Sequence, residues 1–190
     1  MAAHLRPALM SLLLLTVITG VVYPLVVTGI AQMVFPYRAN GSLIVKDGKV
    51  VGSALIGQPF DDPEYFWGRP SAAGQGYDGR SSSGSNLGPS SRALAERIEA
   101  EVARHGGDPT RIPSDLLTAS GSGLDPDISP EAARFQAPRV AAARHLDEAQ
   151  VALLVERAIV APPLGVLGDA RVNVLELNLA LDALAAPALP

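Results

Sequence analysis

The fold is decided by an uncharged stretch at residues 7–37, which reads PALMSLLLLTVITGVVYPLVVTGIAQMVFPY. Leu, Val and Ile dominate it, and it exceeds the roughly 20 residues that a helix needs to cross about 30 Å of hydrocarbon. Each of these side chains favours insertion by about 0.3 to 0.6 kcal/mol at the helix centre, which outweighs the few hydroxyl and amide groups. We therefore expect one transmembrane helix over residues 8–36, preceded by a short terminus at residues 1–7.

A cleavable signal peptide is the competing interpretation, because Arg6 precedes the apolar core and Gly29-Ile30-Ala31 fits a small-x-small cleavage site. Secretory apolar cores are about 7 to 15 residues long, much shorter than this one. The length therefore favours a permanent anchor. Basic residues flank both ends of the stretch, so the positive-inside rule leaves its orientation open.

Three residues within the apolar stretch bear on helix packing. Pro24 removes a backbone hydrogen bond in mid-span and predicts a kink, a defect that neighbouring helices can help to satisfy. Gly20 and Gly29 offer small surfaces that allow close approach of another helix. Two interpretations stay open: contact with other transmembrane helices, or a kink that meets only lipid.

The composition excludes several classes of function. Without cysteine, the 190 residues can form no disulfide, thiol nucleophile, iron–sulfur cluster or cysteine zinc site. The 15 basic residues are scattered singly against 19 acidic ones, for a net charge of −4. A nucleic-acid binder normally carries a basic face, so we expect no nucleic-acid partner.

Residues 37–190 are expected to form one mixed α+β domain outside the membrane. Asp47-Gly48 separates two apolar runs and favours the tight turn of a β-hairpin. Residues 58–91 are rich in Gly, Ser, Pro and Asn, and a loop this long is either disordered or functional. Its Ser/Gly run at residues 81–88 fits a surface loop or a ligand contact, while Tyr65-Phe66-Trp67 is more typical of core anchors than of a binding platform.

Capping residues and apolar spacing predict helices further along the domain. One helix begins after Ser90 or Ser91, buries one apolar face and ends near Gly106. Another is started by Ser129 and the proline after it. Pro138 interrupts that second stretch, so we expect it not to be sustained as a helix.

Two more helices are predicted near the C-terminus. Asp147 and Gln150 have the spacing of a capping box at the start of a helix over residues 147–160. Asn173 gives the same signal for a final helix to about residue 184, with a strand as the alternative. The whole is expected to be a single α+β domain on a membrane anchor.

The search for catalytic motifs is negative. The chain has no phosphate-binding Gly-x-x-x-x-Gly-Lys-Ser/Thr loop, no Gly-x-Ser-x-Gly elbow and no Ser-x-x-Lys pair. His105 and His145 lack metal-ligand spacing, and each ends a helical stretch, where a cation favours the dipole. Asp125 and Asp127 could attract a cation but also fit a turn before a helix. We therefore predict no catalytic residue and no metal site, and an anchored accessory or binding domain.

Short strings from about residue 5 to residue 182 carry a family resemblance that is far more specific than any single motif. They read ITGVVYP (18–24), ANGSL (39–43), GSALIGQ (52–58), YF (65–66), GRPSA (68–72), GSNL (84–87), TAS (118–120), GLD (123–125), ISP (128–130), PRV (138–140) and NVLELNLALD (173–182). The chain resembles the C subunit of the bacterial Kdp potassium-transporting ATPase.

The resemblance implies a potassium uptake complex with three partners: a potassium-channel-like subunit, a P-type ATPase subunit and a small single-span subunit. This chain would be a non-catalytic accessory subunit, and it lacks the Asp-Lys-Thr-Gly phosphorylation site of P-type pumps. In the family the N-terminus is cytoplasmic and the domain lies outside the inner membrane. Gly20, Pro24 and Gly29 then become candidate contacts with partner helices.

The family is also described as a catalytic chaperone that raises the ATP affinity of the ATPase subunit, through a string likened to Leu-Ser-Gly-Gly-Gln. Here the matching positions read Leu146-Asp147-Glu148-Ala149-Gln150. Gln150 is thus the candidate nucleotide contact, with no cofactor of the chain's own and ATP contacted only together with the ATPase subunit. A domain outside the membrane has no access to cytoplasmic ATP, so assembly and stabilisation of the complex is the better-founded role.

The alternative function is a self-contained, membrane-anchored ligand-binding domain. It would use the Gly/Ser-rich loop and Tyr65-Phe66-Trp67 to hold a small molecule without any partner. An anchored hydrolase is disfavoured, because no nucleophile and base can be paired in the sequence.

Overall fold

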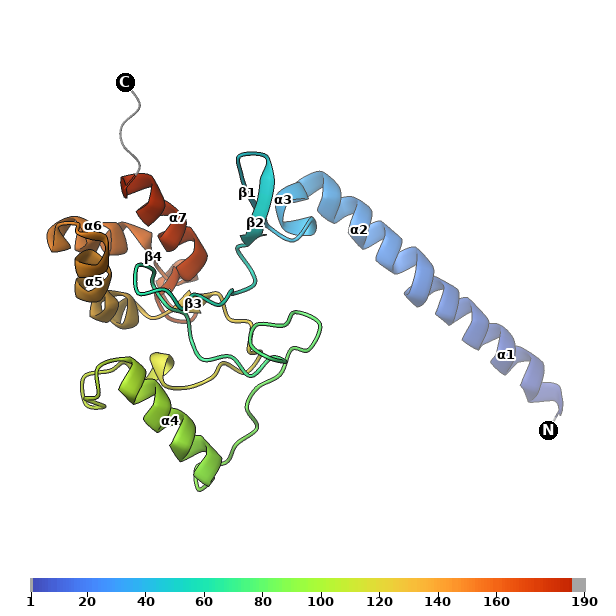
Figure 1. The fold of residues 1–190 in the computed structure, drawn as a ribbon. Helices are drawn as coiled ribbons and strands as arrows, with labels where there is room; N and C mark the ends of the chain where they lie inside the picture. Colours follow the sequence, from blue (N-terminus) through green and yellow to red (C-terminus); the bar gives the residue numbers. More distant parts are fainter. Residues whose placement is uncertain (1, 186–190) are drawn as a thin grey trace. The chain divides into compact units, whose positions relative to one another are not determined.

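The computed structural model describes residues 2–185. The chain divides into two compact units, Met1–Val51 and Gly52–Pro190 (Figure 1). The first unit is mainly helical, whereas the second combines a small antiparallel sheet with several helices. This mixture confirms the predicted α+β class.

A long apolar helix dominates the first unit. It consists of α1 (Ala2–Val17), a π-helical turn η1 (Ile18–Val22) and α2 (Tyr23–Val34). Within it, His4–Val34 is long and apolar enough to cross a membrane, and none of its most apolar window is buried inside the chain. The prediction of a single N-terminal helix of membrane-spanning length is confirmed.

The backbone adapts to Pro24 through the π-helical turn that directly precedes it. Proline has no N–H to donate, so one carbonyl in the preceding turn lacks its α-helical partner. In the same region Thr19 Oγ1 donates a 2.7 Å hydrogen bond to the Leu15 carbonyl. A π turn widens the helix locally and often marks a functional position.

The apolar helix ends at Phe35, whose backbone leaves the helical region (φ −134°, ψ 54°) before the short α3 (Pro36–Ala39). The side-chain amides of Asn40 and Gln32 exchange two hydrogen bonds, at 3.1 and 3.2 Å. The polar Gln32 in the last turn of α2 is therefore satisfied within the chain.

A β-hairpin follows, formed by β1 (Leu43–Lys46) and β2 (Lys49–Ser53). Asp47 and Gly48 both have positive φ, at 52° and 73°. Two successive positive φ values are the requirement of the tight turn that matches the twist of a hairpin. The hairpin predicted from this Asp-Gly pair is confirmed.

The second unit contains a three-stranded antiparallel sheet in the order β3-β5-β4. Its strands are β3 (Asp127–Ile128), β4 (Ile159–Val160) and the central β5 (Arg171–Asn173). Val172 lies opposite both Ile128 and Ile159, and it is fully buried. The sheet therefore contributes a short apolar row to the core.

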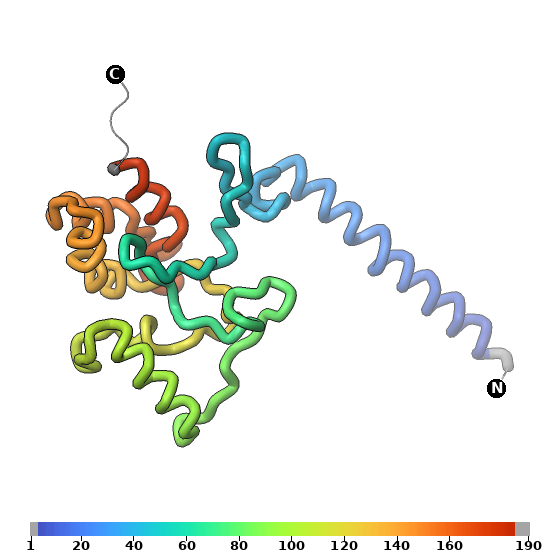
Figure 2. The backbone as a smooth tube through the Cα atoms, viewed as in Figure 1, coloured from blue at the N-terminus to red at the C-terminus, as the bar shows by residue number. Residues whose placement is uncertain are grey.

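Four helices complete this unit: α4 (Arg92–Arg104), α5 (Pro130–Arg144), α6 (Glu148–Ala158) and α7 (Val174–Ala185). Single 3₁₀ turns occur at Ser114–Leu116 and Pro163–Gly165. α5 packs against α6, α6 packs against α7, and all three contact β5, so they gather on one side of the unit (Figure 2). The core between them includes Leu116, Val140, Val151, Val155, Leu177 and Leu181, all with no exposed surface or almost none.

The expectation that Pro138 would prevent a sustained helix is wrong, because α5 runs without a break to Arg144. Its buried face is built of small residues, among them Ala133, Ala137 and Ala141, which allow close packing in the core. Pro138 itself lies on the exposed side of the helix. Burial of the opposite face outweighs the one backbone hydrogen bond that proline removes.

The remaining helix predictions are confirmed. Asp147 Oδ1 accepts a hydrogen bond from the Ala149 amide at the start of α6, and Asn173 Oδ1 accepts one from the Glu176 amide at the start of α7. The segment after residue 173 is therefore a helix and not the alternative strand. In α4 the predicted apolar face, represented by Ile98, is half-buried.

Candidate functional site

The aromatic segment at residues 65–67 is held in place by two buried amide side chains. Asn178 accepts from the Phe66 amide at 2.8 Å and donates to the Phe66 carbonyl at 3.0 Å. Gln136 forms the same pair of bonds with Trp67, at 2.8 and 3.1 Å. A carboxamide offers both an acceptor and donors, so each of these side chains supplies the backbone hydrogen bonds that a neighbouring strand would make to an extended segment. Phe66 is fully buried, which confirms the core-anchor interpretation.

Arginines surround the same aromatic segment. The guanidinium carbons of Arg104 and Arg139 lie 4.2 and 3.8 Å from the centre of the Trp67 ring, and that of Arg144 lies 4.6 Å from the Tyr65 ring. Cations at these distances are attracted to the ring faces. With 7% of its surface exposed and two cations over its ring, Trp67 is not available as a ligand platform.

Arg139 is bound to the segment by neutral acceptors. It donates to the carbonyls of Pro63 at 2.6 Å and Tyr65 at 3.0 Å, and to Gln136 Oε1 at 2.8 Å. Burial, and after it the nearby Arg104, lowers the pKa of Arg139 to about 10. The protein therefore holds this cation in place without an acidic partner in the described part of the chain.

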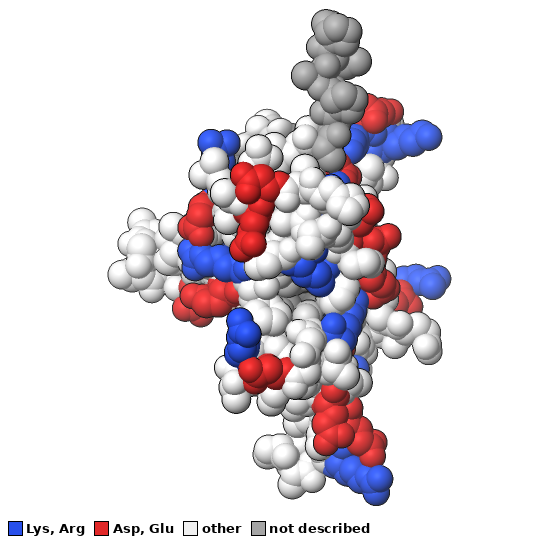
Figure 3. All heavy atoms as spheres, turned by 60° about the vertical axis from the view of Figure 1, so that its left-hand side comes forward, with Lys and Arg blue, Asp and Glu red and all other residues white. Residues whose placement is uncertain are grey.

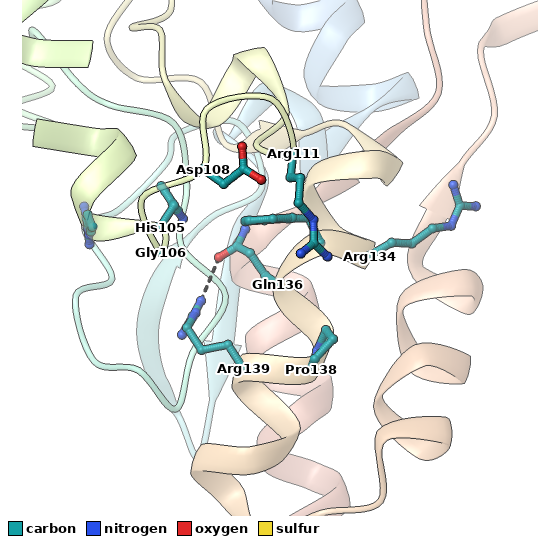
Figure 4. A pocket seen from close by; sticks show the side chains of 10 residues that line it. His105, Gly106, Asp108, Arg111, Arg134, Gln136, Pro138 and Arg139 are labelled. Carbon is teal, nitrogen blue, oxygen red and sulfur yellow. Dashed lines mark hydrogen bonds between the residues drawn. The ribbon is translucent and has the colours of Figure 1, made fainter. Parts of the chain in front are cut away.

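A pocket of about 650 Å³ lies beside this cluster (Figure 4). Its walls come from the end of α4, the loop that follows and the middle of α5. Four of the lining residues are arginines and only one is acidic. The lining residues are Arg104, His105, Gly106, Asp108, Arg111, Arg134, Phe135, Gln136, Pro138 and Arg139.

His105 at the rim of this pocket is a neutral imidazole at neutral pH. Burial, followed by the charges of Arg104 and Arg139, lowers its pKa to about 4. Its ring packs against Trp67, with centroids 5.4 Å apart. The expectation of a cationic histidine at this helix end is wrong for His105, because burial and, after it, the charges of Arg104 and Arg139 disfavour the protonated imidazole.

The predicted transmembrane contacts lie on the apolar helix of the first unit. Nothing lies within 4 Å of a side chain built at Gly20 or at Gly29, so both leave open surface. Gly20 and Pro24 are four residues apart and share a face, whereas Gly29 lies about 140° further round the helix from Pro24. The structure thus brings two of the three residues together.

Gln150 lies exposed in the first turn of α6, where its backbone N–H donates to the backbone carbonyl of Asp147 at 3.0 Å. The return bond that a capping box requires, from the Gln150 side chain to the Asp147 amide, is absent from the hydrogen bonds of residues 2–185. Gln150 lines none of the five pockets described for this part of the chain. Its assignment as a nucleotide contact stays a prediction.

The aspartates considered for cation binding have partners within the protein. Asp125 accepts from the Asp127 amide and pairs with Arg69 at 3.1 Å, while Asp127 pairs with Arg171 at 2.7 Å. These contacts confirm the turn interpretation. Among the described residues, no group of three or more acidic or histidine side chains could hold a metal ion.

The Ser/Gly run at residues 81–88 is hydrogen-bonded to a second irregular segment at Ser122. Ser83 donates its amide to the Ser122 carbonyl at 2.9 Å, and the Ser82 hydroxyl donates to the same carbonyl at 2.9 Å. These contacts support the surface-loop interpretation of the run.

Comparison with known proteins extends over almost the whole chain. The family model "K+-transporting ATPase, c chain" (KdpC) matches residues 5–183. Three similar proteins, each called potassium-transporting ATPase KdpC subunit, come from Caulobacter vibrioides (59% identical, covering 96% of this chain and 94% of the relative), Gemmatimonas aurantiaca (59%, 98% and 96%) and Methylococcus capsulatus (57%, 97% and 100%). The chain therefore belongs to the KdpC family and is an accessory subunit of a potassium-transporting ATPase.

Proposed function

We propose that this chain is a non-catalytic subunit that assembles and stabilises a high-affinity, ATP-driven potassium uptake pump. The observation that carries the proposal is the apolar helix His4–Val34, no part of whose most apolar window is covered by the chain itself. Apolar surface of this extent needs lipid or other transmembrane helices around it. A subunit of a membrane pump meets both.

The expected partners follow from the family resemblance: a channel-like subunit, a P-type ATPase subunit and a small single-span subunit. We place the N-terminus in the cytoplasm and the domain outside the inner membrane. The open face formed by Gly20, within the π turn, and Pro24, just after it, supports a close helix contact, because small residues let two backbones approach. Gly29 would serve a second neighbour on another side of the helix.

Affinity purification tests this proposal. The tagged full-length chain, extracted from its native membrane in mild detergent, should carry the ATPase and channel-like subunits with it in stoichiometric amounts. Gly20→Leu should reduce their recovery while the chain stays in the membrane, and Val26→Leu, a bulky-to-bulky change, should not. Recovery of the chain alone from potassium-limited cells would contradict the proposal.

A second role, raising the ATP affinity of the ATPase subunit, is proposed with Gln150 as the contact; it requires the opposite orientation, with the domain on the cytoplasmic side where ATP is present. It is favoured by one observation: the exposed side-chain amide of Gln150 makes no hydrogen bond with the described residues. Gln150→Ala should then raise the KM for ATP of the assembled pump several-fold, with unchanged subunit recovery. An unchanged KM would assign Gln150 to the surface of α6 alone.

A further inference from the structure

The arginines of the 650 Å³ pocket differ in how their charge is compensated. Arg104 pairs with Asp61 at 2.8 Å, and Arg134 pairs with Glu156 at 2.6 Å. Arg111 and Arg139, in contrast, form no ion pair within residues 2–185. The pocket therefore contains two arginines whose guanidinium groups are in direct contact with no carboxylate of the described residues.

Arg111 is the more available of these two cations. It is exposed, and its guanidinium makes no hydrogen bond to any described residue. Figure 4 shows its side chain extending from the loop after α4 toward α5. The guanidinium of Arg139, by comparison, is engaged by two carbonyls and Gln136.

The single acidic side chain of the pocket is already occupied. Asp108 Oδ1 accepts hydrogen bonds from the Thr110 amide at 3.0 Å and from the Thr110 hydroxyl at 2.6 Å. These bonds, and to a smaller extent Arg111, lower the pKa of Asp108, so it stays ionised and bound to its own turn. Asp108 is near enough to Arg111 to interact with it electrostatically, but it forms no ion pair or hydrogen bond with the guanidinium, so the donors of Arg111 remain available to an external anion.

The pocket favours a carboxylate over a phosphate. A planar guanidinium binds a carboxylate through two parallel hydrogen bonds. Phosphate sites typically add the amides of a helix N-terminus, which α4 does not supply because it presents its C-terminal end here. Phe135 and Pro138 supply an apolar wall for the methylene groups of an acidic side chain.

The face drawn in Figure 3 carries no extended basic surface, because acidic and basic side chains are intermixed on it. A local site of this kind suits one acidic group on a folded partner better than an extended polyanion. Its volume lies within the range of about 300 to 1,000 Å³ that is usual for binding pockets, so it accommodates a side chain with its neighbours.

We propose that the pocket between the end of α4 and α5 receives an acidic side chain from an extramembrane segment of a partner subunit, with Arg111 as the principal contact. This inference rests on the proposed function of the chain as an assembly subunit. It adds the chemistry of one docking contact and the residue that makes it.

The test uses the tagged full-length chain and measures recovery of the pump subunits at rising sodium chloride concentration. Arg111→Glu should lower recovery about tenfold at a salt concentration where the wild-type complex is intact, because like charges then meet in the contact. Arg111→Lys, which keeps the charge but loses the planar fork, should give an intermediate value. Arg80→Glu is the matched control, since the Arg80 side chain is 94% exposed and lines none of the described pockets.

Each outcome bears on a separate claim. Recovery of Arg111→Glu equal to wild type at every salt concentration would overturn the inference and leave the proposed function intact, whereas failure of the wild-type chain to recover any pump subunit would overturn the proposed function.

In a second arm, the chain is mixed with vesicles of phosphatidylglycerol or of phosphatidylcholine. Loss of phosphatidylglycerol binding by Arg111→Glu, with normal subunit recovery, would identify a lipid headgroup as the occupant and also overturn the inference. Equal thermal unfolding of the variant and wild type is the control for folding.

Discussion

Gly123 shows how a single residue controls the packing of two irregular segments. Its φ is +66°, and a side chain added there would lie 2.6 Å from the Ser83 carbonyl oxygen and 2.7 Å from the Ala73 amide nitrogen. Both contacts are backbone atoms, which cannot rotate away. At Gly123 the segment that precedes β3 therefore packs directly against the loop before α4.

Gly123→Ala should therefore lower the free energy of unfolding by about 2 to 4 kcal/mol, from the positive φ and the overpacking together. Gly88→Ala is the control, because its φ is ordinary and nothing lies within 4 Å of the added atom. Thermal unfolding of the full-length chain in detergent, followed by the fluorescence of its one tryptophan, Trp67, measures both. Equal stability of the two variants would show that these segments do not pack as described.

A second single residue, His105, makes the free energy of unfolding depend on pH. Its folded-state pKa of about 4 lies below the ordinary value of 6.5, so the unfolded state binds the proton more readily between these two values. Its contribution is fully present above about pH 6.5 and is lost as the pH falls toward 4. Because the imidazole is half-buried and partly screened, we expect a loss of about 1 kcal/mol between pH 7 and pH 5.

The comparison of wild type with His105→Gln isolates this effect, since other titrating groups such as Glu101 are common to both. The variant should have a flatter dependence of Tm on pH between 7 and 5. Parallel curves for the two proteins would show that burial and the nearby arginines do not hold His105 neutral.

Among single residues, the sequence predicts those whose partners are local. The capping side chains of Asp147 and Asn173 accept hydrogen bonds from backbone amides two and three residues further along the chain, and Asp47-Gly48 forms a turn between adjacent strands. Gln136 and Asn178 could not be assigned, because their partners lie 69 and 112 residues away in the sequence. An amide in a helix carries no local signal that it will bind a distant backbone.

At the scale of elements, tertiary packing overrides local preference. α5 is continuous through Pro138 because its alanine face is buried, which no pattern of helix breakers reveals. The arginine pocket is likewise a product of packing: α4 and α5 contribute residues that are about 30 positions apart in the sequence. The hairpin and the helices were predictable, but the short strands β3, β4 and β5 and the surface between α4 and α5 were not.

α7 supplies a prediction at this scale. Leu181 has no exposed surface and packs in the main core, so Leu181→Ala should lower the free energy of unfolding by about 2 to 5 kcal/mol. Leu184 on the same helix is 48% exposed, and its replacement by alanine should cost less than about 1 kcal/mol. Chemical denaturation of both variants distinguishes a docked α7 from one that lies loosely on the domain, for which the two costs would be similar.

For the whole molecule, physical reasoning from residues leads to an anchored accessory or binding domain, and the family match over residues 5–183 supplies the identity. The reason for this limit is that an accessory subunit acts through surfaces that its partners cover. On our proposals, the uncovered helix His4–Val34 and the exposed Arg111 belong to such surfaces.

Potassium-stimulated ATP hydrolysis by the purified pump, prepared with and without this chain, tests the central claim most directly. Pump isolated from cells that lack the chain should show no potassium-stimulated hydrolysis, and re-expression of the full-length chain should restore it. Undiminished potassium-stimulated hydrolysis in the absence of the chain would contradict its role as a subunit that the pump needs for assembly and stability.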